Sequence, residues 1–338
     1  TIEQREGELG KLCALLPETP LQQFSEDISK QLVSDLSILP RNFPTERLKT
    51  KQWSKSGKPA IAVSTQQKYF DLYREVIEFS LIGSDVEAIL GQVEVKSSED
   101  GGSYEPFTDK ELSTIFNGCV YLAECHQHNK RKEYMYWLPL LGLFTGMRLN
   151  ELCQLHVADI KQYQGVWYFD NNLNFHDPNV EDKQLKGKGG KRASIRLVPI
   201  HDELIRIGFI DFVQKQRIGD NAHMLFDRLT MSSRGKWYKE PSRYFSQYLE
   251  ELGVKEGENK HTKVFHSLRH NFITALTKGC YGHNKLINDA HEKRKRIIGH
   301  SLPDEVTQGY TTLGAEIVQA WKEVIDLVDY DVNLSHLY

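Results

Sequence analysis

The sequence predicts a two-domain protein that is mainly α-helical and contains one small antiparallel β-sheet. Its 338 residues are enough for two separate hydrophobic cores. A polar run at residues 96–103, rich in Ser, Gly and acidic residues, cannot bury apolar area and is typical of a linker. Apolar residues recur at helical spacing on both sides of it, whereas strand-forming residues are concentrated between residues 166 and 200. We therefore expect a helical domain at residues 1–100 and a larger domain at residues 106–338.

The clearest helix of the first domain is expected from Ser64, a suitable N-cap, to about Leu81, with Gly83 as its stop. Its apolar side chains fall on one stripe, as expected for the core-facing side of a helix: Tyr69, Leu72, Tyr73, Val76 and Ile77.

The second domain opens with Thr108 and Glu111 at capping-box spacing, so that each side chain can satisfy a free backbone N–H of the other residue. Another helix is expected through residues 138–144. Gly146 can end it in a left-handed conformation, and a short helix carrying Leu149, Leu152 and Cys153 follows.

The sheet is expected next along the chain. Residues 166–169 (Val-Trp-Tyr-Phe) are strand formers, and residues 180–188 and 191–200 are predicted to form a hairpin that turns on Gly189-Gly190. After His201 the pattern is helical to the C-terminus, where one helix carries an apolar stripe of Ile317, Trp321, Val324 and Val328.

Composition excludes several classes of protein. The longest apolar run, Trp137 to Phe144, contains Pro139 and is too short to span a bilayer, and no signal peptide is visible. The five cysteines are scattered without a C-x-x-C pair, which argues against a disulfide framework. The Cys-His-Gln-His run at residues 125–128 fits no common zinc spacing. We expect a cytoplasmic protein that needs no metal and no cofactor.

The charge is unevenly distributed. A net charge of −3 argues against a uniformly basic nucleic-acid binder. Charge acts only over about 10 Å, however, and basic residues gather at 41–58, 183–196 and 293–296. Any one cluster is an ordinary solvated face, but three together predict a segregated positive surface.

Five short strings carry candidate chemistry, although each alone has a structural explanation. Gly146 and Arg148 could be a helix stop and a surface arginine, and His266 and Arg269 share a helix face. The Gly-Gly turn could be an ordinary solvated turn, Gly299 and His300 could be the end of a helix, and Tyr310 could be a core residue. The strings are residues 145–152 (TGMRLNEL), 196–201 (RLVPIH), 266–270 (HSLRH), 298–301 (IGHS) and Tyr310.

Taken together, in this order and approximate spacing, the five strings resemble the catalytic box of the tyrosine recombinases, the phage-integrase type of site-specific recombinase. The match covers roughly residues 106–330, and the helical N-terminal part resembles that family's SAM-like core-binding domain. The resemblance implies the two-domain architecture of a DNA breaking-rejoining enzyme, with residues 106–338 as the catalytic domain and its C-terminal tail helix.

The resemblance also implies the role of each residue. Arg148 and Arg269 would hold the phosphate, which suits their permanent charge and forked donors. Tyr310 would attack phosphorus and form a 3′-phosphotyrosine that stores the bond energy, so rejoining needs neither ATP nor metal. His266 would handle protons, and His300 would donate a hydrogen bond to the phosphate. Glu151 resembles the acidic residue that supports the first arginine, although a helix-surface carboxylate is the alternative.

Two departures from the family pattern matter. The general-acid lysine is expected at Lys188, beside the Gly-Gly turn, but Lys191 fits the distance to Pro199 better, and Lys186 fits an extended hairpin. An apparent insertion lies around residues 281–296. In the family the C-terminal segment often docks on a neighbouring protomer, so the stripe at 317–328 can serve its own core or another copy.

The expected partner is double-stranded DNA, with four copies assembled on it and single copies in free solution. Accessory DNA-bending proteins are candidate partners, and no membrane is involved. The chain would act on the nucleoid of a prokaryote, in integration or excision of a mobile element. The alternatives are a type IB topoisomerase and a non-catalytic DNA-binding protein of the same fold. The start at Thr1 leaves open an arm-binding domain ahead of it.

Overall fold

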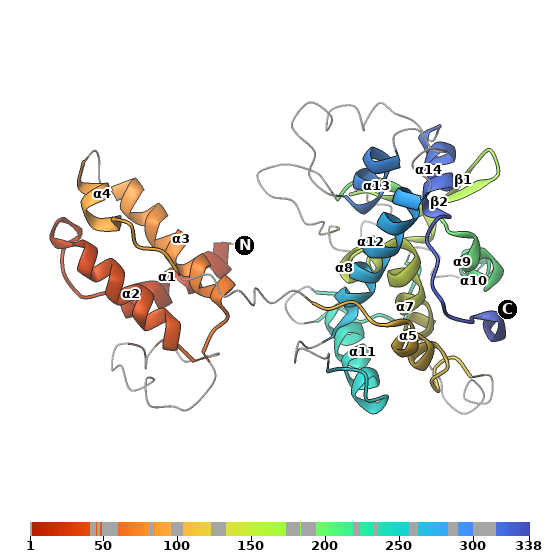
Figure 1. Cartoon of the computed structure of the whole chain (residues 1–338), viewed down its shortest axis with the longest axis horizontal. Coiled ribbons are helices and arrows are strands. Elements are labelled where there is room, and N and C mark those ends of the chain that lie inside the picture. The colour runs from red at the N-terminus through yellow and green to blue at the C-terminus, as the bar shows by residue number, and fades with distance from the viewer. Residues whose placement is uncertain are drawn as a thin grey trace. The chain divides into compact units, whose positions relative to one another are not determined.

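The computed structural model divides the chain into two compact units, Thr1–Ser103 and Tyr104–Tyr338 (Figure 1). It describes residues 2–40, 45, 48, 60–80, 84–95, 104–122, 133–173, 183, 194–218, 224–232, 236–256, 263–282, 290–299 and 316–338. The fold is mostly helical with one three-stranded antiparallel sheet, as the sequence predicts. Among the described helices, none combines the length and apolar character that crossing a bilayer requires.

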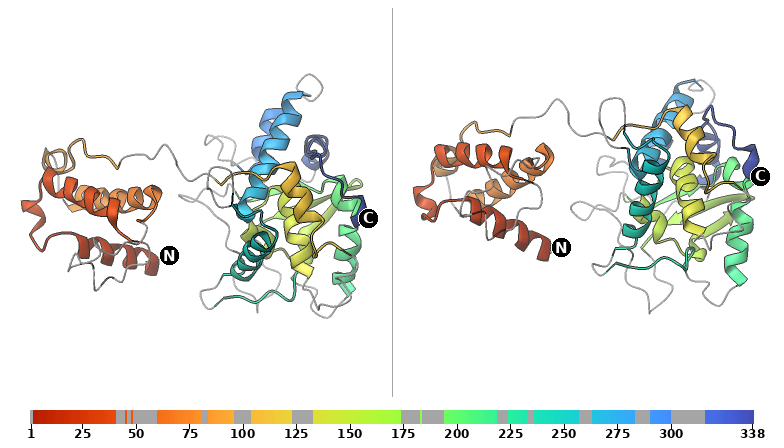
Figure 2. Two further views of the ribbon diagram at one scale, coloured as in Figure 1. Left: turned by 60° about the horizontal axis from the view of Figure 1, so that its bottom comes forward. Right: turned by 90° about the horizontal axis from the view of Figure 1, so that it is seen from below.

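The N-terminal unit is a group of helices around its own core (Figure 2). The predicted helix is present as Val63–Ser80, and its Tyr69, Tyr73 and Ile77 are buried. Ser64 is not its N-cap, because the helix begins one residue before it. The predicted end at Leu81 and stop at Gly83 lie outside the described residues. Ser29 joins three helices, because its Oγ donates to the Ile89 carbonyl at 2.6 Å and lies 3.0 Å from the Tyr73 hydroxyl. The helices are α1 Ile2–Leu15, α2 Glu26–Ile38, α3 Val63–Ser80 and α4 Ser84–Leu90.

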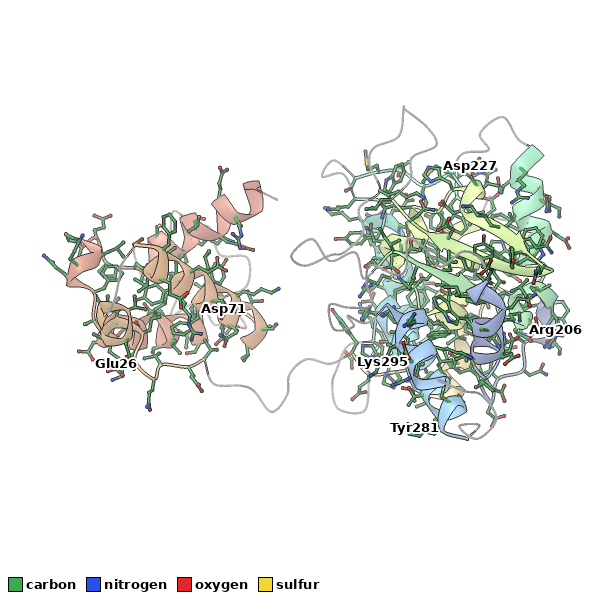
Figure 3. The ribbon with its side chains drawn as sticks, turned by 90° about the horizontal axis from the view of Figure 1, so that it is seen from above. Glu26, Asp71, Arg206, Asp227, Tyr281 and Lys295 are labelled. Atoms are coloured by element: carbon green, nitrogen blue, oxygen red, sulfur yellow. The ribbon has the colours of Figure 1, made fainter. Side chains whose placement is uncertain are left out.

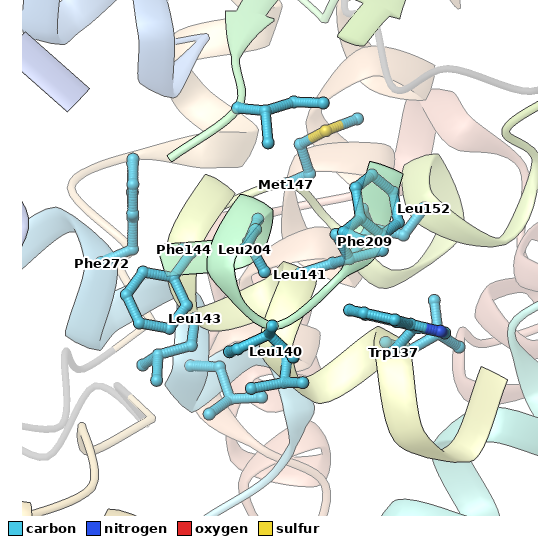
Figure 4. Packing of buried hydrophobic residues seen from close by; sticks show 14 of the residues in the cluster. Trp137, Leu140, Leu141, Leu143, Phe144, Met147, Leu152, Leu204, Phe209 and Phe272 are labelled. Atoms are coloured by element: carbon cyan, nitrogen blue, oxygen red, sulfur yellow. The ribbon is translucent and has the colours of Figure 1, made fainter. Parts of the chain in front are cut away.

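The C-terminal unit is built around α7 (Glu133–Thr145), whose residues 137–145 are all buried. Side chains from α7 pack against Leu204, Phe209 and Phe272, which come from three other helices (Figure 4). Pro139 lies inside this helix. The predicted capping box at Thr108 is present and opens α5 (Asp109–Phe116). An all-round apolar helix is typical of the centre of a domain.

Two glycines allow α12 (Phe265–Gly282) to lie unusually close to α7. A Cβ on Gly142 would come within 2.8 Å of the Phe265 ring, and one on Gly146 within 2.2 Å of the Phe272 ring. Gly146 also has φ +60°, the left-handed conformation predicted for the residue that ends α7. The chain then turns directly into the predicted short helix α8 (Leu149–Cys153).

The sheet consists of β1 (Ile160–Tyr163), β2 (Val166–Asn171) and β3 (Arg196–Pro199), with β2 in the centre. The predicted strand at 166–169 lies wholly within β2, and the one predicted at 191–200 is present as residues 196–199. Strand β1 was not predicted. Gln164 and Gly165 form the turn between β1 and β2, both with positive φ. The other arm of the predicted hairpin, residues 180–188 with the turn at 189–190, lies outside the described residues except for Lys183.

After the sheet the chain is helical, as predicted, in α9 Asp202–Arg206, α10 Phe209–Ile218, α11 Lys239–Glu251, α12, α13 Ala290–Ile298 and α14 Ile317–Ile325. The predicted apolar stripe lies in the core of its own unit: α14 packs against β3, β2, α12 and α13, and Trp321 and Val324 are buried. The helix ends at Ile325, so Val328, also buried, follows it. The segment after α14 also packs on its own unit, since the hydroxyl of Tyr330 donates to the Leu143 carbonyl at 2.8 Å.

His201 fixes the junction between β3 and α14. Its Nδ1 accepts the Glu203 N–H at 3.0 Å, so Nε2 carries the proton and donates to the Val328 carbonyl, also at 3.0 Å. Burial lowers the pKa of His201, which favours this neutral tautomer. These bonds hold residues 317–328 in the core of their own unit, rather than leaving the stripe to a neighbouring copy.

Replacing Gly146 with alanine should lower the free energy of unfolding by about 3 kcal/mol, because a left-handed alanine is strained and its Cβ would clash with Phe272. Gly165→Ala is the matched control. Gly165 has φ +88° but open space around its Cβ, so only the backbone strain of about 1–2 kcal/mol applies. Urea unfolding measures both variants, and equal losses would show that the contact with Phe272 is not a constraint.

Candidate active site

A buried carboxylate lies between two arginines at the start of α8. Glu151 Oε1 accepts from Arg148 Nη1 at 2.8 Å, and Oε2 accepts from Arg196 Nη2 at 2.9 Å. Oε2 also accepts the backbone N–H of Arg148 at 3.0 Å, which satisfies one of the free donors at the start of the helix. Only 2% of the Glu151 side chain is exposed, so this residue is a structural bridge and not the surface carboxylate of the alternative interpretation.

The two arginines differ in what they can reach. The Arg196 side chain is 1% exposed, and each of its three guanidinium nitrogens donates to a protein acceptor. Besides the bond from Nη2 to Glu151, Nε donates to the Ile297 carbonyl and Nη1 to the Ser194 carbonyl, each at 2.9 Å. The Arg148 side chain is 27% exposed. Its guanidinium group donates two hydrogen bonds to described residues, both from Nη1: one to Glu151 and one to Ser194 Oγ at 3.4 Å. Arg148 can therefore present Nε and Nη2 to a ligand.

Arg269 connects α7 to α13. Its Nη1 donates to the carbonyl of Gly146, and its Nη2 donates to the carbonyl of Ile298 at 2.7 Å. The neighbouring carbonyl of Ile297 is held by Arg196. Two arginines thus bind consecutive carbonyls at the C-terminus of α13, where cations compensate the partial negative charge of a helix end. Gly299 follows with φ +73° and ends the helix.

These contacts bring three guanidinium groups and one carboxylate into one electrostatic cluster. Burial opposes ionisation of Glu151, but attraction to Arg196 and Arg148 outweighs it and lowers the pKa to about 2. Burial, together with repulsion from Arg196 and Arg148, lowers the pKa of Arg269 to about 9. All three arginines remain charged at neutral pH, so the cluster carries an excess of positive charge suited to an anion.

His266 lies one turn before Arg269 on α12, as the spacing predicts. Its ring contacts two other rings edge-on, those of Tyr104 at 5.6 Å and His270 at 5.1 Å between centroids. Burial, followed by repulsion from Arg269, lowers the pKa of His270. Both histidines lie on the helix that carries Arg269, and the lowered pKa of His270 favours its neutral form.

The described residues contain Arg148, His266 and Arg269 of the predicted site. Lys188, with its alternatives Lys186 and Lys191, and also His300 and Tyr310 lie outside the described residues. So does the Cys-His-Gln-His run at residues 125–128. Within the described part of the chain, His, Cys, Asp and Glu form no group that could hold a metal ion.

Two residues of the second basic cluster, Lys183 and Arg196, are not part of a positive surface, and the other four lie outside the described residues. Lys183 is 4% exposed in its side chain and pairs with the buried Asp159 at 2.6 Å, and Arg196 is enclosed by Glu151 and backbone carbonyls. Both charges were grouped by sequence proximity, which cannot show that they point inward. In the third cluster, Arg294 donates to Thr277 Oγ1 at 2.6 Å, while Lys295 is exposed at the outer side of α13 (Figure 3).

Arg196 is the site residue that sequence reasoning missed. The sequence indicates only that Arg196 begins the string at residues 196–201 and belongs to a basic cluster, which predicts a surface charge and no role of its own. The signal was its position in a strand two residues before the buried Val198, because alternation in a strand places both side chains on the same face.

Glu151→Gln should destabilise the protein by about 3 kcal/mol at pH 7, because a neutral amide leaves the buried charge of Arg196 without an anion. The folded-state pKa of about 2 lies below the ordinary value of 4.5, so the stabilisation is complete above pH 4.5 and declines as the pH falls toward 2. Urea unfolding should show that the difference in free energy of unfolding between wild type and Glu151→Gln becomes smaller from pH 7 to pH 3.

The exposed Glu323→Gln on α14 provides the control and should change stability by less than about 0.5 kcal/mol throughout. If the difference in free energy of unfolding between wild type and Glu151→Gln stayed constant with pH, the ionised bridge would be contradicted.

Comparison with known proteins identifies the family and supports the fold. The family model described as the phage integrase family matches residues 105–313. The integrase of transposon Tn1549 in complex with transposon right-end DNA has a similar structure, with a TM-score of 0.51 and 16% identity over 90% of this chain and 86% of that chain. This likeness supports the fold.

Other solved structures are related at lower TM-scores. A lambda integrase dimer bound to a COC′ core site gives 0.49, with 15% identity over 92% of this chain and 88% of that chain. The integrase from mycobacterium phage Brujita gives 0.41, with 13% identity over 91% and 88%. No curated protein matched the sequence. Because the family model covers more than half of the chain, the protein belongs to the phage integrase family of tyrosine recombinases.

Proposed function

We propose that the protein is a site-specific DNA recombinase that cleaves and rejoins DNA through a 3′-phosphotyrosine intermediate, in the integration or excision of a mobile element. The observation that carries the proposal is the cluster of Arg148, Arg269 and Arg196 around one buried carboxylate. Family membership and fold support the same conclusion.

The chemistry requires positive charge at the scissile phosphate. When a tyrosine oxygen attacks phosphorus, negative charge develops on the non-bridging oxygens, and fixed cations stabilise it without having to reorganise. Arg148 donates a hydrogen bond to Glu151, and Arg269 donates hydrogen bonds to two backbone carbonyls. The two side chains come from different segments, α8 and α12, which the close packing of α7 and α12 brings together.

The oxygen of Tyr310 loses its proton and forms a bond to phosphorus, while the bond from phosphorus to the 5′ oxygen breaks. His266 accepts the proton of the tyrosine hydroxyl, and Lys188 gives the departing 5′ oxygen its proton. His300 donates a hydrogen bond to the phosphate. Attack of a 5′ hydroxyl on the phosphotyrosine reverses these changes, so the step uses neither ATP nor a metal ion.

The N-terminal unit would bind DNA as a core-binding domain, and four copies would assemble on the recombining sites. The neighbours with dimers or complexes on DNA are consistent with this partner. A type IB topoisomerase is the rival enzyme. Exchange of strands between two marked duplexes would favour the recombinase, whereas relaxation of supercoils without site preference would favour the topoisomerase.

The nucleophile is tested with a nicked suicide duplex that traps the covalent intermediate, using a DNA site taken from the ends of the element that encodes the protein. Wild type should form a protein–DNA adduct, and Tyr310→Phe should form none because the attacking oxygen is absent. Tyr238→Phe, at the start of α11, is the control and should react like wild type. An adduct with Tyr310→Phe would show that another residue attacks.

The general acid is tested with a duplex in which sulfur replaces the 5′ bridging oxygen. A thiolate leaves without being protonated, so the loss of the acid should matter only for the oxygen substrate. We expect Lys188→Ala to form adduct slowly with oxygen and at the wild-type rate with sulfur. Lys186→Ala and Lys191→Ala serve as matched variants, and the same rescue in one of them instead would move the role to that lysine.

A further inference from the structure

We infer that Arg196 is a positioning residue for DNA cleavage, which keeps Arg148 available to the phosphate by taking up the negative charge of Glu151. The inference rests on the proposed function and assigns a role to a side chain that does not itself reach DNA. All of its donor nitrogens bind protein acceptors, and 1% of its side chain is exposed.

Arg196 affects Arg148 first through charge. Glu151 carries one negative charge and contacts two guanidinium groups, one through each of its oxygens. If Arg148 were its only partner, the pair would be close to neutral and Arg148 would attract a phosphate weakly. With Arg196 as a second partner, the three residues together keep one excess positive charge. Because the Arg196 side chain is enclosed and that of Arg148 is partly exposed, the excess positive charge acts at Arg148.

The second step concerns position. Arg196 Nη1 and Asn171 Nδ2 both donate to the Ser194 carbonyl, at 2.9 and 2.6 Å, while Ser194 Oγ accepts from Arg148 at 3.4 Å. Arg196 Nε holds the Ile297 carbonyl, next to the Ile298 carbonyl that Arg269 holds. One buried side chain therefore supports Arg148 on one side and the end of α13 on the other.

The third step separates this role from simple stabilisation. A buried cation that only stabilised the fold would affect cleavage of any substrate to the same extent. One that acts on the charge of Arg148 should matter only when the phosphate is charged. Replacing one non-bridging oxygen of the scissile phosphate with a methyl group gives a methylphosphonate, which has the same connectivity but no negative charge.

The experiment compares adduct formation on suicide duplexes with a phosphate or a methylphosphonate at the cleavage position. Arg196→Met should lower the rate on the phosphate by on the order of 100-fold, as expected when a fixed charge is removed from a transition state. On the methylphosphonate it should react within about threefold of wild type, since little charge then remains to be stabilised. Arg217→Met is the control, because Arg217 also binds a backbone carbonyl, that of Ile160 at 2.7 Å, and among the described residues it has no hydrogen bond or ion pair with Arg148, Glu151 or Arg269.

A second variant covers the case in which Arg196→Met does not fold. Arg196→Met combined with Glu151→Gln removes both buried charges and leaves Arg148 positive, so it should cleave the phosphate faster than Arg196→Met alone, and in any case measurably. Equal losses of Arg196→Met on both substrates, wild-type activity on the phosphate, or an inactive, folded double variant would each overturn the inference. Failure of wild type to form any adduct would instead overturn the proposed function.

Discussion

The ionised Glu151 carboxylate, held between Arg148 and Arg196, is the interaction on which the site depends. A buried carboxylate is stable only if its charge is compensated, and here two cations and a backbone N–H compensate it. The same contacts set the position of the short helix α8, the strand β3 and, through Ile297, the end of α13. Removing Glu151 leaves the buried charge of Arg196 without an anion, and removing Arg196 leaves Glu151 with Arg148 alone, so the elements of the site are energetically coupled.

The fold supplies the geometry that this cluster needs. The glycines at 142 and 146 allow α7 and α12 to pack closely, and the left-handed Gly146 directs the chain from α7 into α8. As a result the carbonyl of Gly146 faces Arg269 while Arg148, two residues later, faces Glu151. Backbone carbonyls thus anchor one arginine and a carboxylate anchors the other. Rigid anchoring of this kind reduces the reorganisation that charge development would otherwise demand.

Much of the fold was predictable because the signals are local. The capping box at Thr108, the glycine stop at Gly146 and the apolar stripe on α3 each depend on residues within a few positions, and all three are present. The strand β1 was missed because its four residues carry little apolar pattern, and its turn of Gln164 and Gly165 is less distinctive than a Gly-Gly pair.

The inward direction of Lys183 and Arg196 could not be predicted, since it depends on Asp159 and Glu151, which lie 24 and 45 residues away. The stripe on α14 had two interpretations for the same reason. An apolar face shows that a helix is covered but not by which chain, and only the contacts with β2, β3, α12 and α13 decide that it is covered by its own unit. The arginine and histidine pair on α12 was predictable because its spacing is one helical turn.

The most direct test of the account is to identify the amino acid that becomes bonded to DNA. The trapped protein–DNA adduct can be digested with nuclease and protease and the nucleotide-bearing peptide sequenced by mass spectrometry. The account predicts a single modified peptide with the nucleotide attached through its 3′ phosphate to Tyr310. A nucleotide on a different residue, or a 5′ linkage, would contradict it.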